Sequence, residues 1–392
     1  MTAIEQAVAG GVSFALTEEQ KELRALAREF AAKEIRPVAA EHDVHMRHPV
    51  EVIAKAHEVG LMNLHVPAEY GGPGLNTFDG MLVGEEVNWG CTGIGTSIGA
   101  NGLGAGPVLI AGTDEQKATW LPPLLDAPIL CSFGLSEPDA GSDVARLKTT
   151  AERRGDEYVL NGSKTFITNA GYADWTVVFA KTDVSKGHRG MSAFIVPMDS
   201  PGVTIEQHLD KMGQRATDTS AFALQDVVVP AANRLGQEGD GFKLAMQTLD
   251  HTRPGTAIGA VGVAQAAYEL AVAYAKERVT FDLPIAMHQG VNFMIADMAT
   301  EIEAARLLTW QAAWMIDRGE RATLYSSFAK RFSADTAMKV TTDAVQVFGG
   351  YGYMKEYPVE KLMRDAKLFQ IYEGTSQIQR LVIAKEIFLP RG

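Results

Sequence analysis

The sequence predicts an α+β protein of three domains, in which a middle β-domain separates two helical domains. Helical periodicity dominates up to about residue 127, short β-branched and aromatic runs occupy 128–236, and long amphipathic segments return in 237–392. A chain of 392 residues has room for two or three domains, and its hydrophobic fraction of 46% allows large cores. We therefore expect an N-terminal α-helical domain (1–127), a middle antiparallel β-domain (128–236) and a C-terminal helical bundle (237–392).

The first domain should begin with a capped helix. Thr17 and Gln20 have the spacing of a capping box. The apolar positions that follow recur at helical spacing, at Leu23, Leu26, Ala27 and Phe30. Pro37 should kink or end this helix, because proline has no N–H and clashes with the preceding turn. A concentration of proline and glycine at 65–74 predicts a loop.

Segment 87–113 has no charged residue and is long enough to cross a bilayer. Its eight glycines, Pro107 and several polar side chains make it a poor membrane helix. We expect instead a buried pair of helices that lines a cavity. At the N-terminus, the mildly apolar stretch 7–16 follows Glu5 and no basic residue, which argues against a signal peptide. These features predict a cytoplasmic protein without stable membrane insertion.

The middle domain should contain antiparallel strands. Four runs rich in β-branched and aromatic residues are separated by turn-forming dipeptides such as Gly155-Asp156. The runs are 158–160, 175–180, 191–196 and 221–229. In the third domain, the segment 291–314 is apolar along one face at helical spacing, and its length indicates packing in a bundle.

Charge and cysteine content exclude several classes of function. The net charge of −12, from 36 basic and 48 acidic residues, argues against nucleic acid as the main partner. The nine histidines show no metal-ligand spacing. Cys91 and Cys131 are far apart in the sequence, so we expect buried, reduced thiols rather than a disulfide framework. The Rossmann-like glycine pattern at 102–106 follows no predicted strand.

The segment IYEGTSQIQR at 371–380 places one carboxylate, Glu373, among several hydrogen-bonding side chains. Gly374 permits close approach of a ligand to the backbone. An apolar helical run follows, and a loop-to-helix junction of this kind is a common position for reacting groups. On these residues alone, the simpler interpretation is a surface helix that Thr375 or Ser376 caps, with Glu373 favouring its positive end.

Motifs elsewhere in the chain change this interpretation. They are CSFGLSEPDAGSDV (131–144), LNGSKTFITNAG (160–171), LGQEGDGFKLAM (235–246), LDHTRPG (249–255), AVQVFGGYGY (344–353) and YPVEKLMRDAK (357–367). Together with 371–380, their order and spacing resemble the acyl-CoA dehydrogenase family of flavoproteins, and its medium-chain branch most closely. The resemblance implies a helical N-terminal domain, a middle antiparallel β-barrel-like domain and a C-terminal four-helix bundle.

The resemblance also implies a reaction. This is the FAD-dependent α,β-dehydrogenation of a fatty acyl-CoA to the trans-2-enoyl-CoA in β-oxidation, performed by a homotetramer arranged as a dimer of dimers. Glu373 would be the base that removes the α proton, and its backbone N–H would help to stabilise the enolate-like charge. The hydride would pass to flavin N5, and the electrons to an electron-transfer flavoprotein. Other branches place the base where Thr252 stands, so Glu373 is the only candidate base here.

The resemblance assigns further ligand contacts. The expected flavin contacts are Phe133, Leu135, Ser136, Phe166, Thr168, Arg278, Thr280, Phe281, His288, Gln289, Gln346, Gly349, Gly350, Thr375 and Gln377. The segment 278–281 would reach the flavin diphosphate from a neighbouring subunit. The expected substrate contacts are Ser142, Asp250, Arg253, Gly374, Gly95 and Gly99. Two alternatives stay open: Asp250 and Arg253 could form a surface ion pair, and Gly349-Gly350 could end a helix.

Five positions depart from the medium-chain pattern. Phe133 replaces a tyrosine and Phe166 a tryptophan, so each keeps a ring but loses a polar group. Asp282 replaces a glycine, which could alter the local turn. Gly95 and Gly99, four residues apart on one helix face, replace glutamine and glutamate at the floor of the acyl pocket. Their small size would either deepen the pocket for long or branched acyl groups or allow close packing of helices.

Two other functions share this motif pattern. An acyl-CoA oxidase would use the same fold with oxygen as the acceptor. A catalytically idle paralogue would bind acyl-CoA without reacting. The intact Glu373 and flavin motifs favour the dehydrogenase over the idle paralogue.

Overall fold

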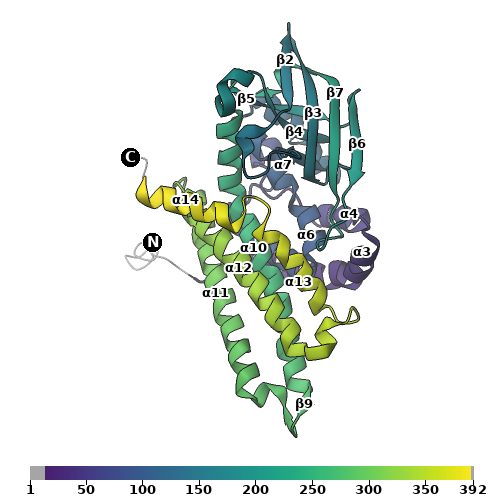
Figure 1. Ribbon diagram of the computed structural model, residues 1–392, viewed down its shortest axis with the longest axis vertical. Helices are drawn as coiled ribbons and strands as arrows, with labels where there is room; N and C mark the ends of the chain where they lie inside the picture. The colour runs from purple at the N-terminus through teal and green to yellow at the C-terminus, as the bar shows by residue number, and fades with distance from the viewer. Residues whose placement is uncertain (1–13, 390–392) are drawn as a thin grey trace.

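The computed structural model describes residues 14–389, so Glu5 and most of the stretch 7–16 that was weighed as a signal peptide lie outside the described residues. The molecule is elongated (Figure 1). A β-sheet lies at one end, and three long helices extend towards the other: α10 (Gly241–Glu277), α11 (Gln289–Asp317) and α12 (Thr323–Phe348). The N-terminal helices pack beside both parts.

The first N-terminal helix forms as its cap predicts. α2 (Glu18–Phe30) begins after Thr17, whose side chain accepts a hydrogen bond from Gln20 N–H while the Gln20 side chain accepts one from Thr17 N–H. This capping box confirms the prediction. The chain then passes through a π-helical turn and a 3₁₀ turn that contains Pro37, so the predicted break is also confirmed. The helices that follow are α3 (Ala39–His45), α4 (Val50–Glu58), α5 (Thr77–Gly90), α6 (Thr92–Gly99), α7 (Asn101–Ala111), α8 (Asp114–Trp120) and α9 (Pro123–Asp126).

The uncharged segment forms the helix pair α6 and α7, as expected. α6 packs on α5, and α7 packs on α10 and on strand β1 (Cys131–Gly134). By length and composition alone, the stretch Thr92–Ala111 and α10 could each cross a membrane, but 56% and 61% of these windows are buried inside the protein. Buried core helices have the same composition, so packing is sufficient to account for it.

The middle domain is one mixed, open sheet. Its strands are β1, β2 (Thr150–Arg154), β3 (Glu157–Thr168), β4 (Trp175–Lys181), β5 (Met191–Pro197), β6 (Val203–His208), β7 (Thr219–Pro230) and β8 (Arg234–Leu235). They lie in the order β6-β7-β3-β2-β4-β5-β8, and β1 pairs with β4. All four predicted runs are strands. The expectation of an antiparallel, barrel-like domain was wrong in two respects, because β1 and β2 run parallel to β4, and the terminal strands of the described sheet, β6 and β8, are unpaired with each other. An alternating pattern indicates which faces are buried, not the direction of the neighbouring strand.

Two hydrophobic cores join the three parts of the chain. The larger core lies between the N-terminal and C-terminal helices and includes Ile35, Val87 and Ile258. The second core packs the helices around α7 against one face of the sheet and includes Val108 and Phe179. Both cysteines are free and buried, as expected. Because the cores cross between the parts, the parts position one another and the loops between them.

The C-terminal domain is built around α10, which packs on α5, α11 and α12. The predicted helix 291–314 lies within α11. A hairpin of β9 (Val279–Thr280) and β10 (Leu283–Pro284) joins α10 to α11. Phe281 and Asp282 in its turn both have left-handed φ, 50° and 63°. Aspartate tolerates this conformation better than most residues, so the turn forms without the expected glycine. α13 (Val359–Lys367) and α14 (Ser376–Phe388) complete the described fold.

Candidate active site

Glu373 lies in the short loop that leads into α14. Its φ is 51° and that of Gly374 is 87°, so two consecutive residues are left-handed and the chain reverses direction before the helix. Thr375 then caps α14, because its side chain accepts from Ile378 N–H at 3.1 Å. The helix-cap interpretation of this segment is therefore correct for Thr375. Glu373 itself stands outside the helix and faces the protein interior.

The Glu373 carboxylate is partly buried against α10. Thr252 donates its hydroxyl hydrogen to Glu373 Oε2 at 3.2 Å. Burial raises the pKa of the Glu373 carboxyl above its ordinary value. Hydrogen bonds from Thr256 and Thr252 and the positive charges of Lys330 and Arg253 oppose this rise without cancelling it. A carboxylate with a raised pKa is a stronger base than one in water, which suits proton abstraction.

The backbone around Glu373 is held through its carbonyl groups. Lys330 Nζ donates to Gly374 O at 2.6 Å. Gln379 Nε2 donates to Glu373 O at 3.2 Å and to Gly374 O at 3.0 Å. Glu373 N–H has no acceptor within residues 14–389. An unpaired N–H beside a carboxylate can stabilise negative charge that develops on a substrate oxygen.

The expected substrate residues on α10 lie beside this loop. Asp250 and Arg253 form an ion pair, as one alternative proposed, and Asp250 Oδ2 also accepts from Thr323 Oγ1 at 2.8 Å. Arg253 is buried, however, so the pair is not confined to the surface. Ser142 is exposed in the loop before a 3₁₀ turn and shares no hydrogen bond with either residue in the described chain. Tyr372, the residue before Glu373, has a side-chain hydrogen bond with Thr96 and so links the loop to α6, which contains Gly95 and Gly99.

The first group of expected flavin contacts lies in and just after β1 and at the C-terminal end of β3. Thr165 N–H donates to Ser136 O at 3.0 Å, so the two motifs that contain them are adjacent. A register shift between Lys164 and Ile167 forms a bulge in β3, where Phe166 adopts a left-handed φ of 59°. The Phe166 ring is 69% exposed as a result. Leu135 is buried, and Phe133 packs on the core ring of Phe179 at 4.9 Å between ring centroids.

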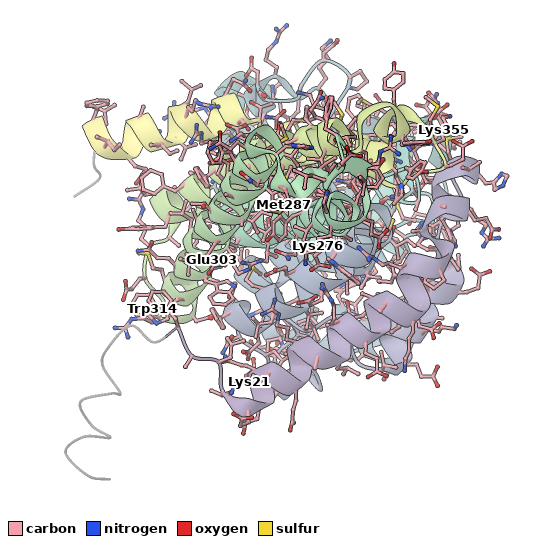
Figure 2. The ribbon with its side chains drawn as sticks, turned by 90° about the horizontal axis from the view of Figure 1, so that it is seen from below. Lys21, Lys276, Met287, Glu303, Trp314 and Lys355 are labelled. Carbon is pink, nitrogen blue, oxygen red and sulfur yellow. The ribbon has the colours of Figure 1, made fainter. Side chains whose placement is uncertain are left out.

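The second group lies at the opposite end of the molecule. It comprises Arg278, Thr280, Phe281, His288, Gln289, Gln346, Gly349 and Gly350. Figure 1 shows β9 at the far tip of the molecule, well away from the sheet. Figure 2, which views the molecule from below, shows Met287 and Lys276 near the middle of this end. One chain therefore does not bring the two groups together, whereas a neighbouring copy could supply the second group.

Both groups contain polar atoms that no protein group satisfies. Within the described residues, the hydroxyls of Ser136 and Thr168 form no hydrogen bond, and Arg278 forms no ion pair; its guanidinium lies 5.8 Å from the ring centroid of Tyr351. Phe281 is 91% exposed. Free hydroxyls and an unpaired guanidinium are hydrogen-bond donors that fit the polar atoms of a flavin nucleotide, and an exposed ring fits its apolar surface. Thr375 and Gln377 follow Glu373 closely in the chain, at the start of α14.

Sequence reasoning missed Lys330, Thr256 and Tyr372. Lys330 and Thr256 lie on helices, where their residue types give no sign that they approach a loop far along the chain. Tyr372 could have been noticed, because it precedes Glu373 directly. Only the packing of α10 and α12 on the loop shows that these side chains adjoin the carboxylate.

Comparisons with known proteins agree with this geometry. Three family models match in order: acyl-CoA dehydrogenase N-terminal domain at 17–127, middle domain at 132–227 and C-terminal domain at 239–388. The chain belongs to the acyl-CoA dehydrogenase family and is an oxidoreductase of that class.

Individual relatives cover nearly the whole chain. A probable acyl-CoA dehydrogenase of Bacillus subtilis, YngJ, is 47% identical over 96% of this chain and 100% of its own length. A probable medium-chain specific acyl-CoA dehydrogenase of Caenorhabditis briggsae is 44% identical over 95% of this chain and 91% of its own length.

Two solved structures share the fold closely. Butyryl-CoA dehydrogenase from Megasphaera elsdenii has a TM-score of 0.94 at 43% identity, covering 96% of this chain and 100% of that chain. A chain from a structural study of the electron transferring flavoprotein of Acidaminococcus fermentans has a TM-score of 0.94 at 44% identity, with the same coverage of both chains. The helical, β and helical order of the predicted fold is thereby confirmed.

Proposed function

We propose that this acyl-CoA dehydrogenase is FAD-dependent and that Glu373 is its catalytic base. It would convert a fatty acyl-CoA to the trans-2-enoyl-CoA. The observation that supports this most is the Glu373 carboxylate, which lies partly buried beside a free backbone N–H in a loop held by Lys330 and Gln379. Asp250, the carboxylate on the neighbouring face of α10, forms an ion pair with Arg253 instead.

The chemistry requires such an arrangement because the α C–H of a thioester is a very weak acid. A carboxylate removes its proton only where water is excluded and the charge on the thioester oxygen is stabilised. Burial of Glu373 reduces its contact with water, which is the first condition, and this desolvation raises the pKa of the base. Glu373 N–H is the donor in this chain that can supply the second. Gly374, without a side chain, leaves the approach to this N–H open.

The two flavin groups fit FAD when a second copy supplies one of them. Ser136, Thr168 and the exposed ring of Phe166 would hold the flavin ring of one subunit, and Arg278 and Phe281 of a neighbouring subunit would hold its diphosphate end. Bound FAD supplies the acceptor for the hydride that leaves the β carbon. This sharing supports a dimer, and the resemblance to the family is the basis for proposing a homotetramer arranged as a dimer of dimers.

Substrate and partner follow from the same reasoning. Arg253 and Asp250 would contact the thioester substrate from α10, and Ser142 would approach it from the loop of the β-domain. We assign an electron-transfer flavoprotein as the electron acceptor, supported by the likeness to a chain from a structural study of such a protein. We place the protein in the cytoplasm, on the sequence features alone.

The proposal is tested by anaerobic titration. The purified protein should contain FAD and be yellow, and acyl-CoA should bleach its absorbance without oxygen. Glu373→Gln should keep the fold and the flavin while the rate of bleaching falls by about 10²- to 10⁴-fold. Glu51→Gln, an exposed glutamate on α4, is the matched control and should bleach like wild type.

Other outcomes distinguish the competing functions. Rapid formation of hydrogen peroxide in air would identify an oxidase. Acyl-CoA binding without bleaching would identify an idle binding protein. Bleaching by Glu373→Gln within a few-fold of wild type would require a different base.

A further inference from the structure

Lys330 is a fully buried lysine on α12 that the reaction described above does not use. Its neighbours on the helix are small, with Ser326, Ser327, Ala329 and Ser333 all buried around it. The Nζ atom has one hydrogen-bond acceptor in the described chain, Gly374 O, at 2.6 Å. An ammonium group has three donors, and burying it is costly unless charge nearby compensates. The side chain that compensates the charge of Lys330 therefore indicates the role of this lysine.

Three charged side chains surround Lys330. Glu373 faces it from the loop, Arg253 from α10, and Asp335 from its own helix. Arg380 of α14 pairs with Asp335 at 2.9 Å, and Asp250 pairs with Arg253, so these two acids already have basic partners. The Glu373 carboxylate has hydroxyl partners but no ion pair among the described residues. It is therefore the charge that Lys330 balances.

The loop itself needs support. Glu373 is a non-glycine residue in the left-handed region, a conformation that is unfavourable for an L-residue. Gly374 favours glycine because its φ of 87° is left-handed, and a Cβ there would also lie 2.7 Å from Gln379 Nε2. Lys330 and Gln379 approach from two different helices and bind the carbonyls of this turn. They fix the direction of the peptide groups and, with it, the direction of Glu373 N–H.

We propose that Lys330 is a positioning residue for the Glu373 base. Its hydrogen bond to Gly374 O holds the left-handed turn, and its charge stabilises the ionised Glu373 carboxylate against burial. This inference rests on the proposed function, since it assumes that Glu373 acts as the base. Lys330 would act in two separable ways: on the geometry of the loop and on the ionisation of Glu373.

Loss of the Lys330 charge and loss of its hydrogen bond should change different parts of the pH profile of flavin bleaching. Burial lowers the pKa of Lys330 to about 8, and Glu373 opposes this shift. The ammonium is therefore charged through the neutral range, where it favours the carboxylate form of Glu373. Removal of this charge should move the acidic limb of the bleaching rate to higher pH. Removal of the hydrogen bond should lower the plateau rate, at which Glu373 is fully ionised.

Two substitutions separate these effects. Lys330→Met removes both the charge and the donor at similar length. Lys330→Gln removes the charge but keeps a donor, one bond shorter, for Gly374 O. Lys339→Met on the same helix removes a lysine that forms a surface ion pair with Glu301, and it serves as the control. Anaerobic flavin bleaching by acyl-CoA is measured for each across pH, together with FAD content and the oligomeric state.

Lys330→Met should lower the plateau rate on the order of tenfold or more and move the acidic limb to higher pH. Lys330→Gln should recover part of the plateau but keep the moved limb, and Lys339→Met should match wild type. A second readout needs no substrate: infrared difference spectra on acidification should show the carboxylic acid band of Glu373 at higher pH in both Lys330 variants. The loss of this band in Glu373→Gln identifies it.

The proposal would be overturned if both Lys330 variants showed the same acidic limb and the same plateau rate of bleaching as wild type. If Lys330→Met loses FAD or fails to assemble, the infrared titration and Lys330→Gln decide the question. Failure of the underlying function would look different, because Glu373→Gln would then bleach normally. An inactive Glu373→Gln together with unaffected Lys330 variants would refute the role of Lys330 alone.

Discussion

Gly95 and Gly99 lie one helical turn apart on α6 but have opposite surroundings. A Cβ at Gly95 would lie 3.1 Å from the side-chain amide of Asn88, whereas a Cβ at Gly99 would meet nothing within 4 Å. Gly95 is buried and Gly99 is exposed. The two interpretations of these glycines therefore apply to different residues: Gly95 serves close packing of α6 on α5, and Gly99 leaves open space.

Gly99→Glu should shift acyl-chain specificity towards shorter substrates. If the open space beside Gly99 is the floor of the acyl pocket, a glutamate side chain would occupy it. Each methylene that then loses its buried position would cost about 0.8 kcal/mol, or roughly fourfold in kcat/KM. The measurement is kcat/KM from butyryl- to palmitoyl-CoA for wild type and variant. An unchanged chain-length preference would place the pocket elsewhere.

Alanine at the two glycines should change stability in opposite directions. Gly99→Ala should stabilise the protein by about 0.5–1 kcal/mol, since alanine favours a helix and no atom is displaced. Gly95→Ala should destabilise it by about 1–3 kcal/mol, because the methyl group overpacks against Asn88. Thermal unfolding midpoints of the two variants provide the comparison. Equal shifts of the same sign would contradict the difference in surroundings.

Arg278→Ala should release FAD and weaken subunit assembly together. Arg278 is exposed at the end of α10 and forms no ion pair within residues 14–389, and the adjacent strand β9 is remote from the sheet that carries the flavin motifs of its own chain. FAD per subunit is measured from absorbance, and assembly by analytical ultracentrifugation. Arg318→Ala is the control, because this exposed arginine contacts only Trp314 and Glu320 among the described side chains. A monomeric wild type with full FAD occupancy would contradict a site shared between subunits.

Lys330 should give the unfolding free energy a characteristic pH dependence. Burial lowers its pKa from 10.5 to about 8 in the folded protein. Between these values the unfolded state binds more protons than the folded state, so stability contributed by this residue rises with pH across the interval. The stability of wild type minus that of Lys330→Met should therefore increase from about pH 8 to 10.5 and be flat below this interval, down to the acidic range in which Glu373 titrates.

The measurement is urea denaturation of both proteins at a fixed concentration, followed by circular dichroism at several pH values. Taking the difference cancels the other lysines and tyrosines that titrate in this interval. A difference that stays constant throughout would show that Lys330 keeps its ordinary pKa in the folded protein.

Much of the fold was predictable from local pattern. The capping box at Thr17 and Gln20, the strand runs of the middle domain and the amphipathic helix at 291–314 all occur where their periodicity indicated. Each depends on residues close together in the chain, and hydrogen-bond capping and side-chain periodicity act over such distances. The segment around Glu373 was singled out only together with the motifs elsewhere in the chain, because its own ten residues favoured a capped surface helix.

Tertiary structure alone decided the rest. The parallel pairing of β1 with β4 joins Cys131 to Trp175, and no local pattern encodes the direction of so distant a neighbour. The same holds for Lys330, whose residue type is that of a surface helix until α12 packs against the loop and buries it. Gly95 and Gly99 are the same residue type in the same helix, and only the tertiary structure shows that Asn88 packs against Gly95 and not against Gly99. Periodicity determines which face of an element is buried, while long-range packing determines what that face meets.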